Sequence, residues 1–261
     1  MNCNPGRIVV NYCKKIPSAN KGAISGCRAL SAGDHVGGYD VQPIRVGILG
    51  PGNIVRRVMT DFHRAERVVL SAVASRDGEK AQKAARAYGA PLAFDSYEAM
   101  ARSDQVDLVY LATPHSLHYE QAMMCMKNGK HVLCEKPMVV NEAQALSMAQ
   151  CARENGVFLM EAMWSRFFPA AHKLRALLEA GAIGDIWHIT ANFSSRSGYD
   201  PASRLYRMDL AGGALLDIGV YPLMAVTGIL GWNPQRVQGL CVRHACGVDV
   251  HESVQLQYES G

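Results

Sequence analysis

The chain has 261 residues, of which 49% are hydrophobic and 19% are charged, a composition typical of a globular protein with a sizeable core. No apolar run in the sequence reaches the roughly 20 residues needed to span a bilayer. Basic and acidic residues are mixed along the chain, and the net charge is +4. We therefore expect neither a membrane nor a nucleic-acid partner.

The eight cysteines contain no CxxC pair, and the segment His115-Ser-Leu-His118 lacks the HExxH pattern of zinc enzymes. We expect no metal site. The irregular cysteine spacing is typical of free thiols, so we expect a cytoplasmic protein.

Residues 1–40 show no regular hydrophobic period and contain basic residues before the first acidic residue, Asp34. We expect an N-terminal extension without ordered structure. A transit peptide and a misassigned start both remain open for this segment.

From residue 41 to residue 162, short Val-, Ile- and Leu-rich runs alternate with helix-length segments, a pattern that indicates βαβ units. The expected strands read IRVGIL, RVVLSAVAS, VDLVYLA, HVLCE and GVFLM, and the expected helices begin near Asn53, Gly78, Ser116 and Asn141. The fold class is therefore α/β, with a doubly wound parallel sheet of the Rossmann type.

The pattern changes at residue 163. Residues 163–261 predict helices over 170–178 and 212–231 and strands over 186–193, 237–242 and 253–258. We expect an incomplete α+β domain with a mostly antiparallel open sheet, for substrate binding and dimerisation.

The first chemical motif follows the first predicted strand and opens a helix. It contains Gly50, Gly52, Asn53 and Ile54. Glycines at such a turn let a dinucleotide pyrophosphate approach the free N–H groups of a helix start. The third small position of GxGxxG is Val55, a departure that weakens the motif, and a plain strand-to-helix turn is the alternative.

At the tip of the second predicted strand stand Ser75 and Arg76, where NAD enzymes usually place an acid. A guanidinium suits a ribose 2′-phosphate, so NADP is favoured over NAD. In the alternative, Asp77 binds the ribose diol and NAD is the cofactor; Asp77 is also placed to cap the next helix.

Two further loops lie at carboxyl ends of predicted parallel strands, the edge at which open α/β sheets bind ligands. One contains Thr113, Pro114, His115 and His118, with His118 expected as a polar contact of the cofactor; the other contains Glu135-Lys136-Pro137. For Lys136 a solvated surface ion pair is the alternative.

Four ordered segments resemble the Gfo/Idh/MocA oxidoreductases, with greatest similarity to the dimeric dihydrodiol dehydrogenases and NADP-dependent D-xylose dehydrogenases. They read LATPHSLHYEQA, HVLCEKPMVVN, FLMEAMWSRFFPA and GGALLDIGVYPL. The resemblance implies an NADP-dependent transfer of hydride between nicotinamide and a CH–OH or C=O carbon of a small sugar, polyol or trans-dihydrodiol.

The same resemblance implies Lys136 and Tyr221 as catalytic residues, with the Lys136 ammonium favouring the Tyr221 phenolate. The implied substrate residues are Trp164, Phe193, Asp217 and Tyr221, and Arg204 is a weaker candidate. Motifs and resemblance together give the cofactor-binding set Gly50, Gly52, Asn53, Ile54, Ser75, Arg76, Thr113, Pro114, His115, His118, Glu135, Lys136, Trp164 and Arg166. Core packing is the alternative for the aromatic members.

Family members extend beyond the point where this sequence ends, so we expect a C-terminally truncated chain. We expect this chain to be less stable and less active than a longer form. We expect the longer form to be a homodimer. Two other functions remain open. One is a non-catalytic NAD(P)-binding sensor, and the other is an NAD-retaining relative that catalyses elimination or glycoside cleavage.

Overall fold

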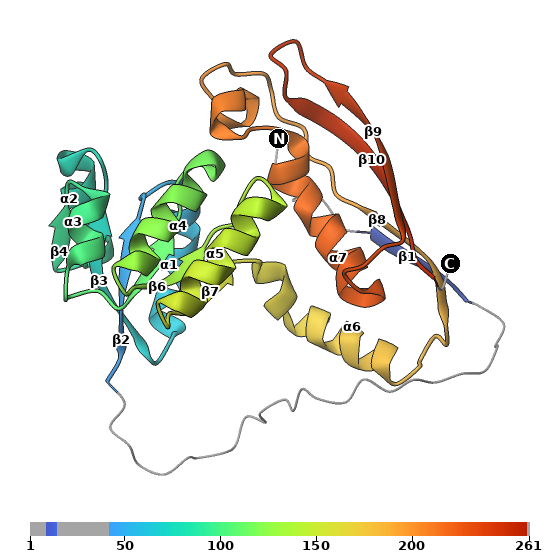
Figure 1. The fold of residues 1–261 in the computed structure, drawn as a ribbon, viewed down its shortest axis with the longest axis horizontal. Helices are drawn as coiled ribbons and strands as arrows, with labels where there is room; N and C mark the ends of the chain where they lie inside the picture. Colours follow the sequence, from blue (N-terminus) through green and yellow to red (C-terminus); the bar gives the residue numbers. More distant parts are fainter. Residues whose placement is uncertain (1–8, 15–41, 260–261) are drawn as a thin grey trace.

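The computed structural model describes residues 9–14 and 42–259. Within that part of the chain, six parallel strands form one sheet in the order β4-β3-β2-β5-β6-β7 (Figure 1). The strands are β2 (Ile44–Leu49), β3 (Val68–Ala74), β4 (Leu92–Phe94), β5 (Leu108–Leu111), β6 (His131–Cys134) and β7 (Leu159–Glu161). The predicted doubly wound parallel sheet is confirmed.

The helices of this part connect consecutive strands. They are α1 (Asn53–Asp61), η1 (Phe62–Arg64), α2 (Gly78–Tyr88), α3 (Tyr97–Arg102), η2 (His115–Leu117), α4 (His118–Lys127) and α5 (Glu142–Glu154). The sequence pattern missed β4 and α3, because three and six residues are too short to establish a period. The strand order reverses between β2 and β5, which places the loops after these two strands at the switch point where α/β sheets bind ligands.

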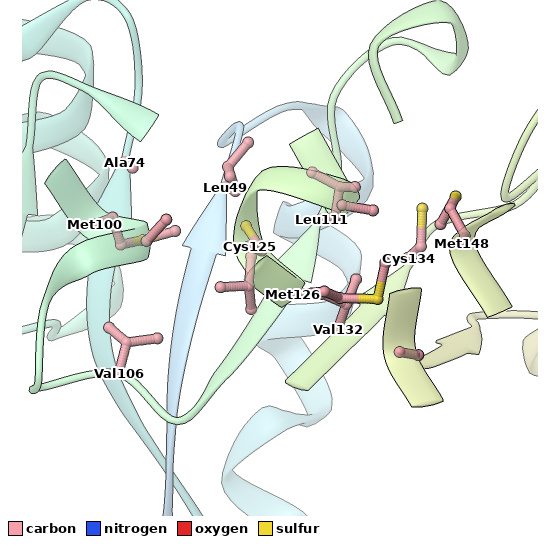
Figure 2. Packing of buried hydrophobic residues seen from close by; sticks show 14 of the residues in the cluster. Leu49, Ala74, Met100, Val106, Leu111, Cys125, Met126, Val132, Cys134 and Met148 are labelled. Carbon is pink, nitrogen blue, oxygen red and sulfur yellow. The ribbon is translucent and has the colours of Figure 1, made fainter. Parts of the chain in front are cut away.

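Apolar side chains from the sheet and its helices form the core (Figure 2). Met100, Val132 and Met148 are completely buried, and each such side chain stabilises the fold by about 1.5–3 kcal/mol. Packing is close around β2, since a Cβ on Gly47 would lie 2.9 Å from the sulfur of Met100. This rigid base supports the loops at the carboxyl ends of the strands.

The second half of the chain contains helices and antiparallel strand pairs. The elements are η3 (Trp164–Phe167), α6 (Pro169–Glu179), β8 (Ile186–Asn192), η4 (Arg204–Tyr206), η5 (Met208–Leu210), the π-helix η6 (Leu215–Gly219), α7 (Val220–Leu230), β9 (Arg236–Arg243) and β10 (Asp249–Gln257). Strands β9 and β10 form a hairpin, and α7 packs on β8 (Figure 1). The predicted antiparallel character of this half is confirmed.

This half is less well packed than the first. Every residue of β9 is exposed, and Leu240 is 81% exposed. In the described part of the chain, one helical segment, Met208–Leu230, has the length and apolar composition of a membrane span, and little of it is buried. Helices that pack inside proteins can have the same length and composition. This segment also contains Asp217, which forms an ion pair with Lys136 of the first half of the chain.

We expected no ordered structure in residues 1–40. Val9–Lys14 instead form β1, which pairs antiparallel with β8 and so has backbone partners that local sequence does not reveal. The rest of that segment lies outside the described residues.

Candidate functional site

The turn between β2 and α1 has the geometry of a pyrophosphate-binding turn. Gly50 has φ +88°, and a Cβ there would lie 2.6 Å from the Cγ2 atom of Thr113. A Cβ on Gly52 would meet nothing closer than 3.8 Å, and Gly52 precedes the first turn of α1 without a side-chain cap. The space above Gly52 and the free N–H groups of α1 fit a phosphate group. Val55, the departure from the glycine motif, is fully buried in the core.

The tip of β3 presents one unpaired cation. The side chain of Asp77 caps α2 by accepting a hydrogen bond from the Lys80 amide at 3.0 Å. The buried Ser75 hydroxyl accepts a hydrogen bond from the Asp77 amide at 3.2 Å. Arg76 is exposed and has no hydrogen bond or ion pair with any described residue. The guanidinium is therefore available to an anion at this tip, while the Asp77 carboxylate is engaged by the helix.

The loop after β5 is held by two histidines with different partners. Both ring nitrogens of the fully buried His118 face backbone carbonyls, that of Pro137 at 2.9 Å and that of Thr113 at 2.8 Å. Burial lowers the pKa of His118, so the neutral ring donates one hydrogen bond, to one or the other carbonyl according to its tautomer. His118 thus joins the loops that follow β5 and β6, and it has no free nitrogen for the cofactor contact that we predicted. His118 therefore holds these two loops in place.

His115 lies at the border of the two halves of the chain. Burial lowers the pKa of His115 to about 4, so the ring is neutral near pH 7. Its Nδ1 donates to the carbonyl of Ala211 at 3.2 Å, and its Nε2 accepts from Arg204 at 3.4 Å. A neutral ring with one donor and one acceptor satisfies both contacts.

The loop after β6 contains Lys136 between two anchored neighbours. The Tyr110 hydroxyl donates to Glu135 at 2.5 Å, and Glu135 also accepts the backbone amide of Lys136 at 3.2 Å. Glu161 of β7 accepts the Met138 amide at 2.8 Å. Burial raises the pKa of Glu135, although the hydrogen bonds from Tyr110 and the Lys136 amide act to lower this pKa. The backbone of Lys136 is therefore fixed on both sides by buried or half-buried carboxylates.

Lys136 meets η6 at Asp217. Its ammonium donates to the Asp217 carbonyl oxygen and lies 3.4 Å from the carboxylate oxygen Oδ1, which also accepts from Arg204 at 2.8 Å. Burial acts to raise the pKa of Asp217, but the charges of Lys136 and Arg204 outweigh it and hold this pKa below its usual value. Asp217 is thus an ionised link between the two halves of the chain.

Tyr221 lies one helical turn beyond Asp217, at the start of α7. Its hydroxyl oxygen accepts a hydrogen bond from the Trp164 indole N–H at 2.7 Å, and the Phe193 and Tyr221 rings pack edge to face with centroids 5.5 Å apart. The Lys136 ammonium lies 5.0 Å from the centre of the Tyr221 ring. The sequence-predicted residues Lys136, Trp164, Phe193, Asp217 and Tyr221 therefore lie together.

The protonation of Tyr221 differs from our expectation. We expected the Lys136 ammonium to favour the phenolate, but burial raises the pKa of Tyr221, and the Trp164 bond lowers it only in part. Lys136 faces the ring of Tyr221, where a cation is attracted to the π-system, and pairs with Asp217. Tyr221 is therefore a neutral phenol near pH 7, and the described residues provide no acceptor for its own O–H.

Arg166 lies apart from this group. Its guanidinium stacks over the Trp232 ring at 5.6 Å, beside a hollow of about 640 Å³ between α6 and α7. A larger hollow of about 1130 Å³ is lined by Phe193 and Asp217, but not by Lys136 or Tyr221. Among the described residues, no group of three or more His, Cys, Asp or Glu side chains is arranged to hold a metal ion.

Sequence reasoning missed Tyr110 and Glu161 and gave Arg204 too little weight. Tyr110 and Glu161 belong to apolar strand patterns, in which a tyrosine or glutamate reads as an ordinary strand residue. The partner of Arg204, Asp217, lies across a loop, so no local spacing links the two.

Comparison with known proteins agrees with this geometry. The family model for the oxidoreductase family with an NAD-binding Rossmann fold (GFO/IDH/MocA) matches residues 44–163, and the model for the GFO/IDH/MocA C-terminal domain matches residues 171–261. The chain belongs to the Gfo/Idh/MocA family.

Named members of the Gfo/Idh/MocA family resemble it in sequence and structure. Trans-1,2-dihydrobenzene-1,2-diol dehydrogenase of Xenopus tropicalis is 43% identical over 188 residues, which are 72% of this chain and 56% of that protein. The 3-ketoreductase KijD10 from Actinomadura kijaniata, in complex with NADP and TDP-benzene, is 32% identical with a TM-score of 0.76, over 84% of this chain and 68% of that one.

A further similar structure is the aldose-aldose oxidoreductase from Caulobacter crescentus complexed with glycerol, at 28% identity and a TM-score of 0.75 over 84% of this chain and 69% of that one. The chain thus spans between about half and two thirds of the length of these relatives.

Proposed function

We propose that this chain holds the reactive site of an NADP-dependent oxidoreductase that transfers a hydride between nicotinamide and a CH–OH or C=O carbon of a sugar, a polyol or a trans-dihydrodiol. The observation that carries the proposal is the convergence of Lys136, Asp217 and Tyr221 from the two halves of the chain. These groups lie at the carboxyl edge of the sheet, beside a turn that fits a dinucleotide.

The Tyr221 phenol is the proton-exchanging group in this proposal. Because its oxygen already accepts from Trp164, its O–H is free to donate to a substrate oxygen as a carbonyl is reduced, and to regain the proton in the reverse direction. Two N–H groups of Lys136 are directed at Asp217, which leaves the third for the same substrate oxygen. Asp217 keeps the ammonium oriented.

The residues that would hold the cofactor are arranged around the switch point of the sheet. Gly52 leaves room for the pyrophosphate, and Gly50 lets the turn pass close to Thr113. The first turn of α1 offers its N–H groups, and the unpaired Arg76 suits a 2′-phosphate. When bound, the nicotinamide supplies or accepts the hydride.

The reaction is tested by nicotinamide absorbance with NADP or NAD against aldoses, inositols, dihydrodiols and dicarbonyls. Lys136→Met and Tyr221→Phe should each lower kcat by at least about 100-fold, with NADP affinity within a few fold. Matched controls are Lys130→Met and Tyr119→Phe, whose parent side chains bond to Ser103 and Ser147, away from the site. No turnover with any substrate in the panel would refute the proposal.

NADP preference is a separate proposal that depends on Arg76. Arg76→Ala should raise the Kd for NADP by roughly 10-fold or more and leave the Kd for NAD within about twofold, since the 2′-phosphate alone distinguishes the two. Arg86→Ala, at the exposed last turn of α2, serves as the charge-matched control. An equal change for both dinucleotides would contradict the assignment.

The two other candidate functions predict different results. A sensor would bind NADP without turnover, and an NAD-retaining lyase would copurify with its dinucleotide and give no net absorbance change. The free Tyr221 O–H favours the oxidoreductase, because a sensor needs no proton donor beside its ligand. We further propose a homodimer, which sedimentation analysis would test, and a cytoplasmic location, which cell fractionation would test.

A further inference from the structure

The helix that contains Asp217 and Tyr221 begins in a confined place. Gly213 has φ +120°, and a Cβ there would lie 2.1 Å from Oδ1 of Asp249. A Cβ on Gly212 would lie 2.4 Å from the carbonyl oxygen of Arg204. Both glycines are therefore required by contacts between the helix start, the loop before it and β10.

Asp249 of β10 satisfies one of the free N–H groups at this helix start. Its Oδ2 accepts the backbone amide of Leu215 at 2.6 Å. A carboxylate at the first turn of a helix both accepts a hydrogen bond and interacts favourably with the helix dipole. Leu215 lies two residues before Asp217, so this bond acts on the turn from which Asp217 extends.

The same strand reaches the other end of the helix. The Tyr258 hydroxyl, immediately after β10, donates to the carbonyl oxygen of Gly231 at 2.9 Å, just after α7 ends. The β9–β10 hairpin thus bonds to both ends of η6–α7. Of the two bonds, the one from Asp249 is near the reactive groups, and the one from Tyr258 is more than two helical turns away.

We infer that Asp249 is a positioning residue, which fixes the start of η6 and thereby holds Asp217 and Tyr221 opposite Lys136. Asp249 itself touches none of the three. The expected effect of Asp249 on kcat rests on the proposed function. Its expected effect on the Trp164–Tyr221 hydrogen bond does not, because that bond depends only on the placement of the same helix.

The test compares Asp249→Ala, Asp249→Asn and Tyr258→Phe in the full chain. Asp249→Ala should lower kcat at least about tenfold and leave the Kd for NADP within about twofold, because the dinucleotide turn belongs to other elements. Asp249→Asn keeps an acceptor for the Leu215 amide and should restore most of the loss. Tyr258→Phe removes the distant bond and should leave kcat unchanged.

A second readout separates this inference from the proposed function. In a background with Trp187→Phe and Trp232→Phe, Trp164 is the remaining tryptophan of the three in the sequence. Its fluorescence should shift to the red in Asp249→Ala, but not in Asp249→Asn or Tyr258→Phe. This shift is expected even if no substrate is turned over.

Three results would overturn the inference. They are an unchanged kcat and emission in Asp249→Ala, an equal effect of Asp249→Ala and Tyr258→Phe, and a failure of Asp249→Asn to restore function. If circular dichroism shows that Asp249→Ala does not fold, Asp249→Glu tests the same point, since its extra methylene displaces the carboxylate. Parental kcat and Trp164 emission in that variant would then refute the positioning role.

Discussion

Replacing Tyr110 by phenylalanine removes a single hydroxyl from beneath the Lys136 loop. That hydroxyl donates to Glu135 at 2.5 Å, and Tyr110 and Glu135 are only 5% and 8% exposed. Water cannot easily replace the lost donor, so a buried carboxylate oxygen is left without its partner. The pKa of Glu135, already raised by burial, should rise further.

The size of the effect follows from this burial. Removing a hydrogen bond to a buried charged group costs about 1.5–3 kcal/mol, so we expect Tyr110→Phe to lower the free energy of unfolding by roughly 2 kcal/mol. For a domain of this size that loss corresponds to a decrease in Tm of roughly 4–8 °C. Because Glu135 also accepts the Lys136 amide, kcat should fall as well.

Thermal unfolding followed by circular dichroism measures the loss, with Tyr119→Phe as the matched control. The Tyr119 hydroxyl bonds to the neutral, half-buried Ser147 at 3.1 Å, so its removal should cost about 1 kcal/mol or less. In a Glu135→Gln background, Tyr110→Phe should cost less than in the parent. Equal losses for Tyr110→Phe and Tyr119→Phe, or no dependence on Glu135, would refute the reasoning.

Three other outcomes follow from the geometry. Gly50→Ala should weaken NADP binding at least about tenfold and lower Tm. Gly89 also has positive φ, but a Cβ there would meet no atom within 4 Å, so Gly89→Ala should lower Tm alone. Equal Kd values of the two variants by fluorescence titration would contradict this. Arg204→Ala should lower kcat/KM by about fivefold, since Asp217 keeps Lys136 as a partner, and an unchanged value would argue against a role for the ion pair. Burial and the neighbouring Asp249 raise the pKa of Glu252 from 4.5 to about 7, so the folded state binds this proton more tightly than the unfolded state. Tm should therefore fall as pH rises from about 4.5 to 7. Glu252→Gln should flatten this dependence of Tm on pH, and an unchanged dependence would contradict the assignment.

The sequence predicted most of the first half of the fold. The apolar runs that became β2, β3, β5 and β6 are local signals, because a strand buried on both faces needs an uninterrupted hydrophobic stretch. The predicted helix starts near Asn53, Gly78 and Asn141 were also found. Asp77 and Asn141 cap α2 and α5, and the glycine turn marks the start of α1. The short β4 and α3 lack such a signal.

The candidate site was predicted only in part. The motifs around Gly50, Lys136 and Asp217 named the residues, and the resemblance to a family implied their roles. Neither gave the neutral state of Tyr221, which depends on its burial between Trp164 and Phe193. Nor did they give the burial of His118 with each ring nitrogen against a backbone carbonyl.

By itself, the sequence determined the parallel sheet, the glycine turn and the identity of the charged and aromatic residues at the strand ends, since each is encoded within a few consecutive positions. Tertiary structure decided which of these residues meet. Lys136 reaches Asp217 across 81 residues, Tyr110 reaches Glu135 across 25 and Asp249 reaches Leu215 across 34. Their charges and protonation states follow from that packing, because burial and the distance to a partner set a pKa and neither is a property of local sequence.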